Sequence, residues 1–285
     1  MNKKEVTRIG LMSDTHMPER LAKLPESLAT VFANVDFILH AGDVGELWVL
    51  DEISQIAPVI AVFGNDETED AQRELPRQQV VTVNGRRILL WHSHFLDRAE
   101  EMASRKGDDF YPKLQRSVDR AKSAGAQIAV FGHWHIPLVY EHEGVLVINP
   151  GGIASGNYTL RQSLRTVAIL EIDQRGKAAY HHVNLDEPNQ PCLPPVDLDA
   201  GFKQGISQVV RSIITPDLQA VWPEAARMLF RQDPTAFKAI LGLLAHPVWA
   251  GERPFFSKDE LITAVQAYED LDDELIEQTI ALLNR

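Results

Sequence analysis

The sequence of 285 residues contains a single cysteine and no long hydrophobic run. Cys192 alone cannot form a disulfide within the chain, which favours a cytoplasmic location over an oxidising compartment. No segment approaches the roughly 18 consecutive apolar residues that a membrane-spanning helix needs. The start, MNKKEVTR, is not followed by the apolar region of a signal peptide. We therefore expect a cytoplasmic protein with no membrane partner.

The chain also lacks an excess of basic residues. It has 28 Lys and Arg against 40 Asp and Glu, which gives a formal net charge of -12. Binding to duplex nucleic acid needs a basic surface that displaces counterions, so duplex nucleic acid is not an expected partner. A small phosphorylated ligand remains compatible with this charge, because bound metal ions reverse the sign of the charge locally.

The first 150 residues alternate strand-like and helix-like segments. Short apolar runs at residues 9–13, 37–40 and 59–63 predict strands, and residues 25–33 and 46–56 have the apolar spacing of helices. This alternation is typical of a sheet with parallel strands and right-handed crossovers. Functional residues on such sheets gather at the carboxyl ends of the strands.

The pattern changes after residue 77, where hairpins replace crossovers. An Asn84-Gly85 turn joins the apolar runs 80–83 and 88–91, and two further hairpins turn near Gly144 and Gly176. These strands predict a second sheet or an extension of the first. Helical character between residues 96 and 124 is broken near Gly107 and Pro112. The hairpin histidines are expected on the surface: His142, His181 and His182.

A proline-rich stretch separates this part from a helical C-terminus. The predicted organisation is a first domain at residues 1–186, a linker at 187–199 and an all-α subdomain at 200–285, which has no convincing strand. Helix starts are marked by Thr215-Pro216, by Asp233-Pro234, and by Ser257 with Glu260. The apolar residues of this subdomain must be buried, so we expect it to support a homo-oligomer or to screen a substrate entrance. A cap that only stabilises the fold is the alternative.

Polar side chains collect where the apolar runs end. In the stretch SDTH, strand alternation would project Asp14 and His16 the same way, although an ordinary turn is the more usual interpretation of these letters alone, because Asp is common in turns. Buried imidazoles and carboxylates are costly unless paired or coordinating. Two divalent ions about 3.5–4 Å apart need about seven such donors, and without thiolates the set suits Mn, Fe, Zn or Ni. The seven are Asp14, His16, Asp43, Asn65, His92, His133 and His135.

The motifs SDTH, AGD, GN, HSH, GHWH and NPG follow one another over about residues 8–183. In this order they resemble the calcineurin-like metallophosphoesterases, above all their small prokaryotic phosphodiesterases, to which the fold of a retromer sorting subunit is related. The resemblance implies an α/β fold, a two-sheet sandwich flanked by helices, here followed by the all-α appendage. It also implies a dinuclear metal-dependent phosphoesterase that hydrolyses small phosphate esters, most of all phosphodiesters, with a metal-bound hydroxide.

The resemblance implies a role for each donor, with manganese as the first expectation and iron, nickel or zinc as alternatives. The first ion would be bound by Asp14, His16 and His135, the second by Asn65, His92 and His133, and Asp43 would bridge both. Asn65 and His94 would also contact substrate. A competent donor at all seven positions favours an enzyme over the alternative, a non-catalytic metal-binding scaffold for protein interactions.

The sequence departs from the family pattern at two places. Asp66 stands where many members have a histidine that protonates the leaving group, so Asp66 is a candidate acid only if its pKa is raised, and a solvated turn residue otherwise. His94 is a second candidate acid. Gly152 replaces the usual serine after NPG, and Ser155 is a candidate substitute for the missing hydroxyl.

Overall fold

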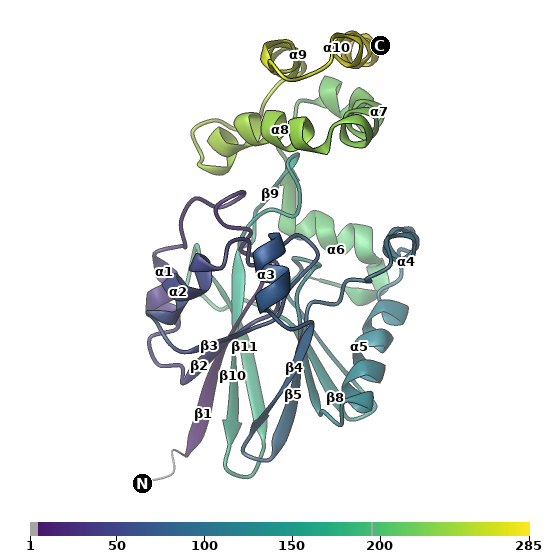
Figure 1. The fold of residues 1–285 in the computed structure, drawn as a ribbon. Coiled ribbons are helices and arrows are strands. Elements are labelled where there is room, and N and C mark those ends of the chain that lie inside the picture. Colours follow the sequence, from purple (N-terminus) through teal and green to yellow (C-terminus); the bar gives the residue numbers. More distant parts are fainter. Residues whose placement is uncertain (1–4, 195) are drawn as a thin grey trace. The chain divides into compact units, whose positions relative to one another are not determined.

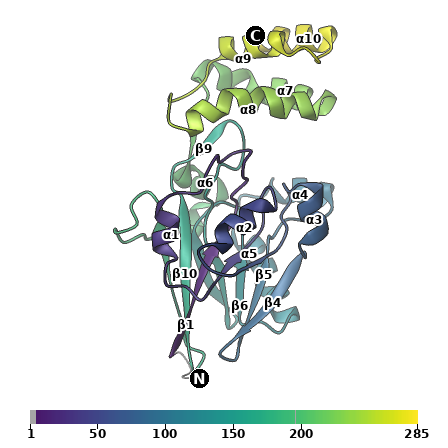
Figure 2. The ribbon, with the colours of Figure 1, turned by 60° about the vertical axis from the view of Figure 1, so that its left-hand side comes forward.

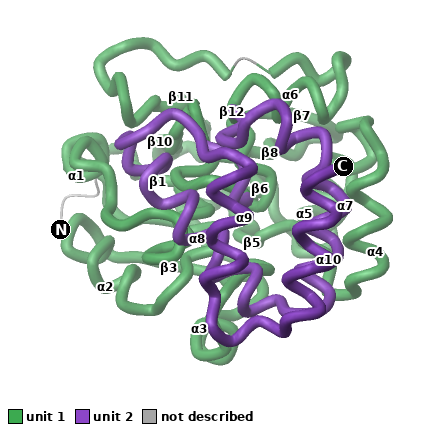
Figure 3. Tube along the Cα trace, turned by 90° about the horizontal axis from the view of Figure 1, so that it is seen from above, with its two compact units in different colours: residues 1–156, 162–210 green, residues 157–161, 211–285 purple. Residues whose placement is uncertain are grey.

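A computed structural model describes residues 5–194 and 196–285 of the chain. The described residues divide into two compact units (Figure 3). Unit 1 holds the residues up to Gly156 together with Gln162–Val210, and unit 2 holds Asn157–Arg161 together with Arg211–Arg285. The expected domain limits at residues 186 and 200 stay a prediction, and helix α6 (Phe202–Val209) lies within unit 1.

One five-stranded sheet of unit 1 has the strand order β11-β10-β1-β2-β3. Strands β1, β2 and β3 run parallel, and the register aligns Met12 with His40 and His40 with Ala61. The carboxyl ends of these three strands therefore meet at one edge of the sheet. The strands are β1 (Val6–Met12), β2 (Phe37–His40), β3 (Val59–Ala61), β10 (Thr166–Asp173) and β11 (Ala178–Asn184).

The second five-stranded sheet has the order β4-β5-β6-β8-β7, and β5, β6 and β8 run parallel. Buried residues of the two sheets, such as Leu11 and Leu39 from one and Leu90 and Val130 from the other, form one apolar cluster. The predicted two-sheet sandwich is therefore confirmed. The strands are β4 (Gln78–Val83), β5 (Arg86–Trp91), β6 (Ile128–Phe131), β7 (Leu138–His142) and β8 (Val145–Asn149).

Helices cover the outer faces of this sandwich (Figures 1 and 2). Phe32, next to α1 (Ser27–Val31), and Ile53 of α2 (Trp48–Ser54) pack on Ile38 of the first sheet. On the other side, α5 (Tyr111–Ser123) packs on Phe131 and Trp134. The Trp134 side chain therefore packs on the helix side of the sheet, away from the candidate site of the flanking His133 and His135. The remaining short helices of unit 1 are α3 (Glu69–Glu74), α4 (Arg98–Ser104) and the 3-10 turn η1 (Leu198–Ala200).

Unit 2 is built from four helices around its own apolar cluster, which includes Leu218, Leu241 and Leu261. Two of the helix starts predicted from the sequence are confirmed by their N-caps. The Asp233 side chain accepts a hydrogen bond from the Ala236 amide, and Ser257 forms a capping box with Glu260. The helices are α7 (Pro216–Gln232), α8 (Pro234–Trp249), α9 (Lys258–Ala267) and α10 (Asp273–Leu283). None of the described helices combines the length and apolar character that a membrane span requires.

Two expectations about this fold were wrong. A strand does occur after residue 200: β12 (Val210–Ser212) forms a two-stranded sheet with β9 (Leu160–Gln162), and three residues are too few to show a period. His182 is not on the surface but 4% exposed, because the backbone near Cys192 bridges to it along the edge of β11. His142 and His181 are exposed as expected.

Candidate metal centre

The candidate site residues lie in loops that follow the parallel strands of both sheets. Six of the eight non-glycine residues with positive φ in the described chain belong to these loops: Asp14 (57°), His16 (45°), Asp43 (54°), Ser93 (80°), His133 (73°) and His135 (56°). A side-chain-bearing residue in this conformation is strained by about 1–3 kcal/mol, and such strain clusters at functional sites.

This backbone corrects the reason given above for pairing Asp14 with His16. Strand β1 ends at Met12, so the two side chains meet through a left-handed turn rather than through strand alternation. The Asp14 amide donates to the Gly42 carbonyl and the His16 amide to the Asp43 carbonyl, which ties this turn to the loop after β2. Two ligand-bearing loops are thereby held at a fixed separation.

A first group of donor atoms is formed by Asp14, His16 and His135. The three residues are buried, and one donor atom from each lies within 4.8 Å of the other two. Nε2 of His135 is 3.3 Å from Oδ1 of Asp14 and 3.5 Å from Nε2 of His16, and the two imidazole rings are stacked with centroids 5.4 Å apart. These are the three residues expected at the first ion.

A second group of buried donors is formed by Asp14, Asp43 and His92. Nε2 of His92 lies 3.2 Å from Oδ2 of Asp43 and 3.2 Å from Oδ1 of Asn65. Oδ2 of Asp43 is also 3.5 Å from Nε2 of His16, so this oxygen lies within reach of both groups. Asp14 is the residue that the two groups share.

The hydrogen bonds of the outer ring nitrogens aim the imidazoles at this centre. Nδ1 of His92 donates to the Ala41 carbonyl at 2.7 Å, and Nδ1 of His135 donates to the Ala154 carbonyl at 2.9 Å. Nε2 of His135 then faces Asp14 and Nε2 of His92 faces Asp43, so a cation that displaces the proton from Nε2 would meet a lone pair there. Lone pairs and negative charge converging in a buried space suit a bound cation, and nitrogen and oxygen donors without thiolates suit a divalent metal of intermediate hardness.

Charge coupling between Asp43 and its neighbours is strong. Burial favours the neutral acid, but the imidazoles of His92 and His16 outweigh it and hold the pKa of Asp43 well below its ordinary value. Burial lowers the pKa of His92, while the Asp43 carboxylate raises it to a net value of about 9. Burial and the nearby Arg20 guanidinium lower the pKa of His16.

His133 and His94 lie beside these groups but belong to neither of them. Nε2 of His133 is 2.9 Å from Oε1 of Glu101, and its ring centroid is 5.1 Å from that of His92. His94 is 6% exposed, and its ring lies 5.4 Å from His92. Burial, then the charges of His92 and His133, lower the pKa of His94 to about 3, so its ring is neutral.

Asp66 is engaged by an arginine. Its carboxylate forms an ion pair with Arg20, and Arg20 also donates to the carbonyl of Ser155 at 3.1 Å. The same carboxylate lies 3.8 Å from Nδ1 of His16, and the Asp66 amide donates to Oδ1 of Asp43 at 2.8 Å. Asp66 therefore lies at the centre, but as an ion-pair partner. Its expected role as the acid stays a prediction.

Polar side chains around the NPG motif form hydrogen bonds with backbone groups of the site loops. Asn149 donates to the Gly132 carbonyl and accepts from the Gly151 amide, which links the loops after β6 and β8. A Cβ at Gly152 would come within 2.5 Å of Nδ1 of His135, so any other residue there would force the His135 ring to shift. The Ser155 hydroxyl accepts from the Gln162 amide; its role as a substitute donor is still a prediction.

Two acidic residues of the site were missed by sequence reasoning. Glu67 accepts from the amides of Val44 and Gly45, both at 2.9 Å, and of Gly64 at 3.1 Å. Burial and the Asp43 charge raise its pKa to about 7. Glu101 contacts His133 from helix α4, 32 positions earlier in the chain. The position of Glu67 beside the GN motif was a usable signal, whereas no spacing in the sequence marks Glu101.

The sequence is similar to proteins of a known family. A model of the calcineurin-like phosphoesterase superfamily domain matches residues 7–175. A probable metallophosphoesterase from Methanocaldococcus jannaschii is 33% identical over 145 residues, 50% of this chain and 66% of the relative, just under two thirds of its length. A phosphodiesterase from the same organism is 27% identical over 180 residues, 59% of this chain and 95% of the relative.

Among solved structures, vacuolar protein sorting 29 from Cryptosporidium parvum matches with a TM-score of 0.47 and 16% identity, covering 64% of this chain and 100% of that one. The family model covers more than half of the chain, and the buried donor groups lie within the matched residues. This chain belongs to the calcineurin-like phosphoesterase superfamily.

Proposed function

We propose that this chain is a metal-dependent hydrolase of small phosphate esters, that phosphodiesters are its preferred substrates, and that it binds two divalent cations. One observation carries the proposal: there are two groups of buried carboxylate and imidazole donors, the donor atoms within each group lie within 4.8 Å of one another, and the two groups share Asp14. Membership of a phosphoesterase family and the likeness to a protein named as a phosphodiesterase support the reaction class.

In this proposal the seven donors divide between two cations. Asp14, His16 and His135 hold the first, Asn65, His92 and His133 hold the second, and Asp43 contacts both. Two such ions would neutralise the charge of a bound phosphate and lower the pKa of an attacking water molecule. Manganese is the proposed metal, with iron, nickel and zinc as alternatives from the same donor chemistry.

Other side chains of the centre would handle the substrate. Nδ1 of His94 is a buried atom that lacks a hydrogen-bond partner among the described residues, which suits it to contact a bound ester, together with the exposed Asn65. Asp66 is held in an ion pair with Arg20, and a carboxylate engaged in this way is a poor proton donor for a leaving group. Esters whose leaving groups need little protonation are therefore the better substrates.

The test combines metal uptake with turnover. Metal-stripped protein is reloaded with Mn²⁺ and assayed with bis(p-nitrophenyl) phosphate and with p-nitrophenyl phosphate. We expect two ions per chain, faster release from the diester, and loss of both properties in Asp14→Asn. His142→Gln, at an exposed histidine, is the control and should retain them.

The outcomes separate the two functions considered. A folded protein that takes up no Mn²⁺, Ni²⁺ or Zn²⁺ and releases no nitrophenol would overturn the proposal. A protein that binds two ions but turns over neither ester would favour the non-catalytic scaffold instead.

A further inference from the structure

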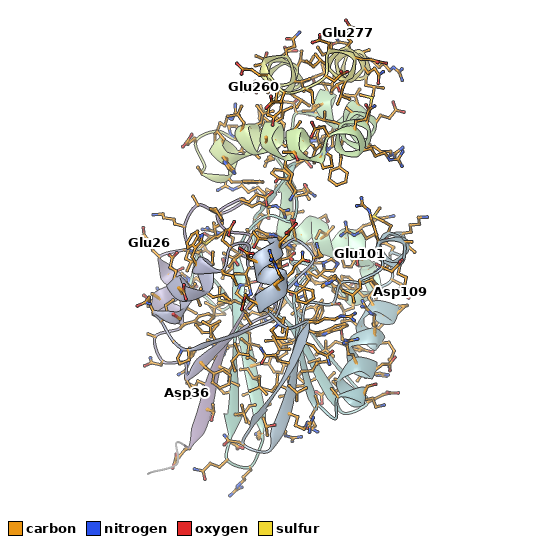
Figure 4. The ribbon with its side chains drawn as sticks, in the orientation of Figure 1. Glu26, Asp36, Glu101, Asp109, Glu260 and Glu277 are labelled. Atoms are coloured by element: carbon orange, nitrogen blue, oxygen red, sulfur yellow. The ribbon has the colours of Figure 1, made fainter. Side chains whose placement is uncertain are left out.

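Glu101 is a buried carboxylate that belongs to none of the family motifs. It lies on α4 (Figure 4), is 8% exposed, and makes three polar contacts. Oε1 is 2.9 Å from Nε2 of His133 and accepts from Nε of Arg105 at 2.8 Å, while Oε2 accepts from the Phe95 amide at 3.0 Å. A carboxylate placed this way binds both loops that carry histidines of the second sheet.

The contact with His133 fixes which ring nitrogen carries the proton. Glu101 in its ionised form only accepts hydrogen bonds, so Nε2 of His133 must donate, and the lone pair of the neutral ring lies on Nδ1. His92 and His135 have the opposite arrangement, since their Nδ1 atoms donate to backbone carbonyls and their Nε2 atoms face the centre. His133 is thus reversed relative to these two histidines.

We propose that Glu101 is a positioning residue that holds His133 in the tautomer presenting Nδ1 to the second cation. The inference rests on the proposed function, because it requires a cation beside His92. A ligating histidine whose other nitrogen donates to a carboxylate is both oriented and made more basic, and loss of such a partner costs about 10–100-fold in metal affinity. Through the Phe95 amide, the same side chain steadies the loop that begins at His92.

The central variant is Glu101→Gln. It keeps the shape of the side chain but places an N–H₂ group where one acceptor stood, so either His133 Nε2 or the Phe95 amide faces a donor. Calorimetric titration of metal-free protein with Co²⁺ should show two sites in the wild type. In the variant, one site should weaken about 10–100-fold and the other should hold its affinity.

Two matched controls come from the same helix region. Glu100→Gln makes the same chemical change at the neighbouring, exposed position and should leave both Co²⁺ sites unchanged. Arg105→Gln removes the other side-chain partner of Oε1 while leaving His133 its acceptor, and its effect should be less than about threefold. A loss in Arg105→Gln equal to that in Glu101→Gln would contradict a route through His133.

A double-mutant cycle distinguishes positioning from a general structural effect. In a His133→Ala background, the loss of Co²⁺ affinity caused by Glu101→Gln should be much smaller than in the wild-type background, because the ligand it positions is absent and only its contact with the Phe95 amide remains. Additive losses would overturn the inference. The nitrogen-15 shifts of His133 in metal-free protein provide a readout independent of metal, with the proton on Nε2 in the wild type and a tautomer mixture in Glu101→Gln.

Failure of this inference differs from failure of the proposed function. A wild type that takes up no ion refutes both. A wild type that binds two Co²⁺ ions, with a Glu101→Gln variant that binds both as tightly, refutes only the positioning role. A His133 ring carrying its proton on Nδ1 in the metal-free wild type refutes it as well.

Discussion

The buried imidazole of His182 makes the stability of unit 1 depend on pH. Its Nε2 is 2.8 Å from the Asn149 carbonyl, to which the neutral ring donates. Burial lowers its pKa from 6.5 to about 4, outweighing the hydrogen bond to Asn149, which acts the other way. Because the folded value is the lower one, the contribution to stability is complete above pH 6.5 and is lost as the pH falls toward 4.

The size of this effect follows from the two pKa values. At pH 5 the unfolded chain protonates His182 and the folded chain does not, which costs about 2 kcal/mol relative to pH 7.5. For a unit of this size, 2 kcal/mol corresponds to about 4–8 °C in the melting temperature. His182→Gln keeps an N–H donor for the Asn149 carbonyl but cannot titrate, so it should lack this part of the pH dependence.

The assay is thermal unfolding in chelator, followed by tryptophan fluorescence between pH 5 and 7.5. Wild type and His182→Gln should differ by about 2 kcal/mol in how much stability they lose on acidification. His181→Gln, at the exposed neighbour, should behave like the wild type. Identical pH dependence in wild type and His182→Gln would refute the assignment of a buried, neutral His182.

Three further outcomes are expected. Asp43→Ala should weaken metal binding by more than the about 10–100-fold that an outer partner costs, whereas His94→Ala should leave it intact; equal losses by calorimetry would contradict the ligand assignment. Because Asp66 is ion-paired with Arg20, aryl phosphodiesters should react much faster than alkyl diesters. Equal rates would show that an effective general acid exists, and pH–rate profiles of Asp66→His would then locate it. If the C-terminal helices mediate a homo-oligomer, Leu243→Glu should lower the mass measured by light scattering, because Leu243 lies on α8 and is 68% exposed. Leu193→Glu, at an 85% exposed residue of unit 1, is the control and should leave the mass unchanged. An unchanged mass in both variants would contradict this role of the C-terminal helices.

The sequence predicted the parts of the molecule whose cause is local. The Asn84-Gly85 turn has φ values of 47° and 80°, as a two-residue hairpin loop requires, and Pro112 stands in the first turn of α5. The order of the motifs predicted which loops carry the polar residues. Their convergence could also be predicted, because parallel strands bring their carboxyl ends to one edge of the sheet whatever side chains they carry.

The parts that escaped prediction depend on packing across the chain. Glu101 reaches His133 only because α4 lies over the loop after β5, and the seven residues of α4 say nothing about where that helix packs. His182 is buried because a segment ten residues later pairs beside it. Such effects are fixed by tertiary contacts, which single-residue spacing does not encode.

The strained backbone of the site depends both on local sequence and on tertiary contacts. Asp14, His16 and Asp43 hold left-handed φ values at a cost of about 1–3 kcal/mol each, which only surrounding contacts can offset. Part of the offset comes from Glu67, which accepts from three amides of the loops that carry Asp43 and Asn65. A carboxylate that accepts from backbone amides of both loops ties the residues around Asp43 to those around Asn65. These contacts between loops help to hold the donor residues in strained backbone conformations that the residues would not adopt on their own.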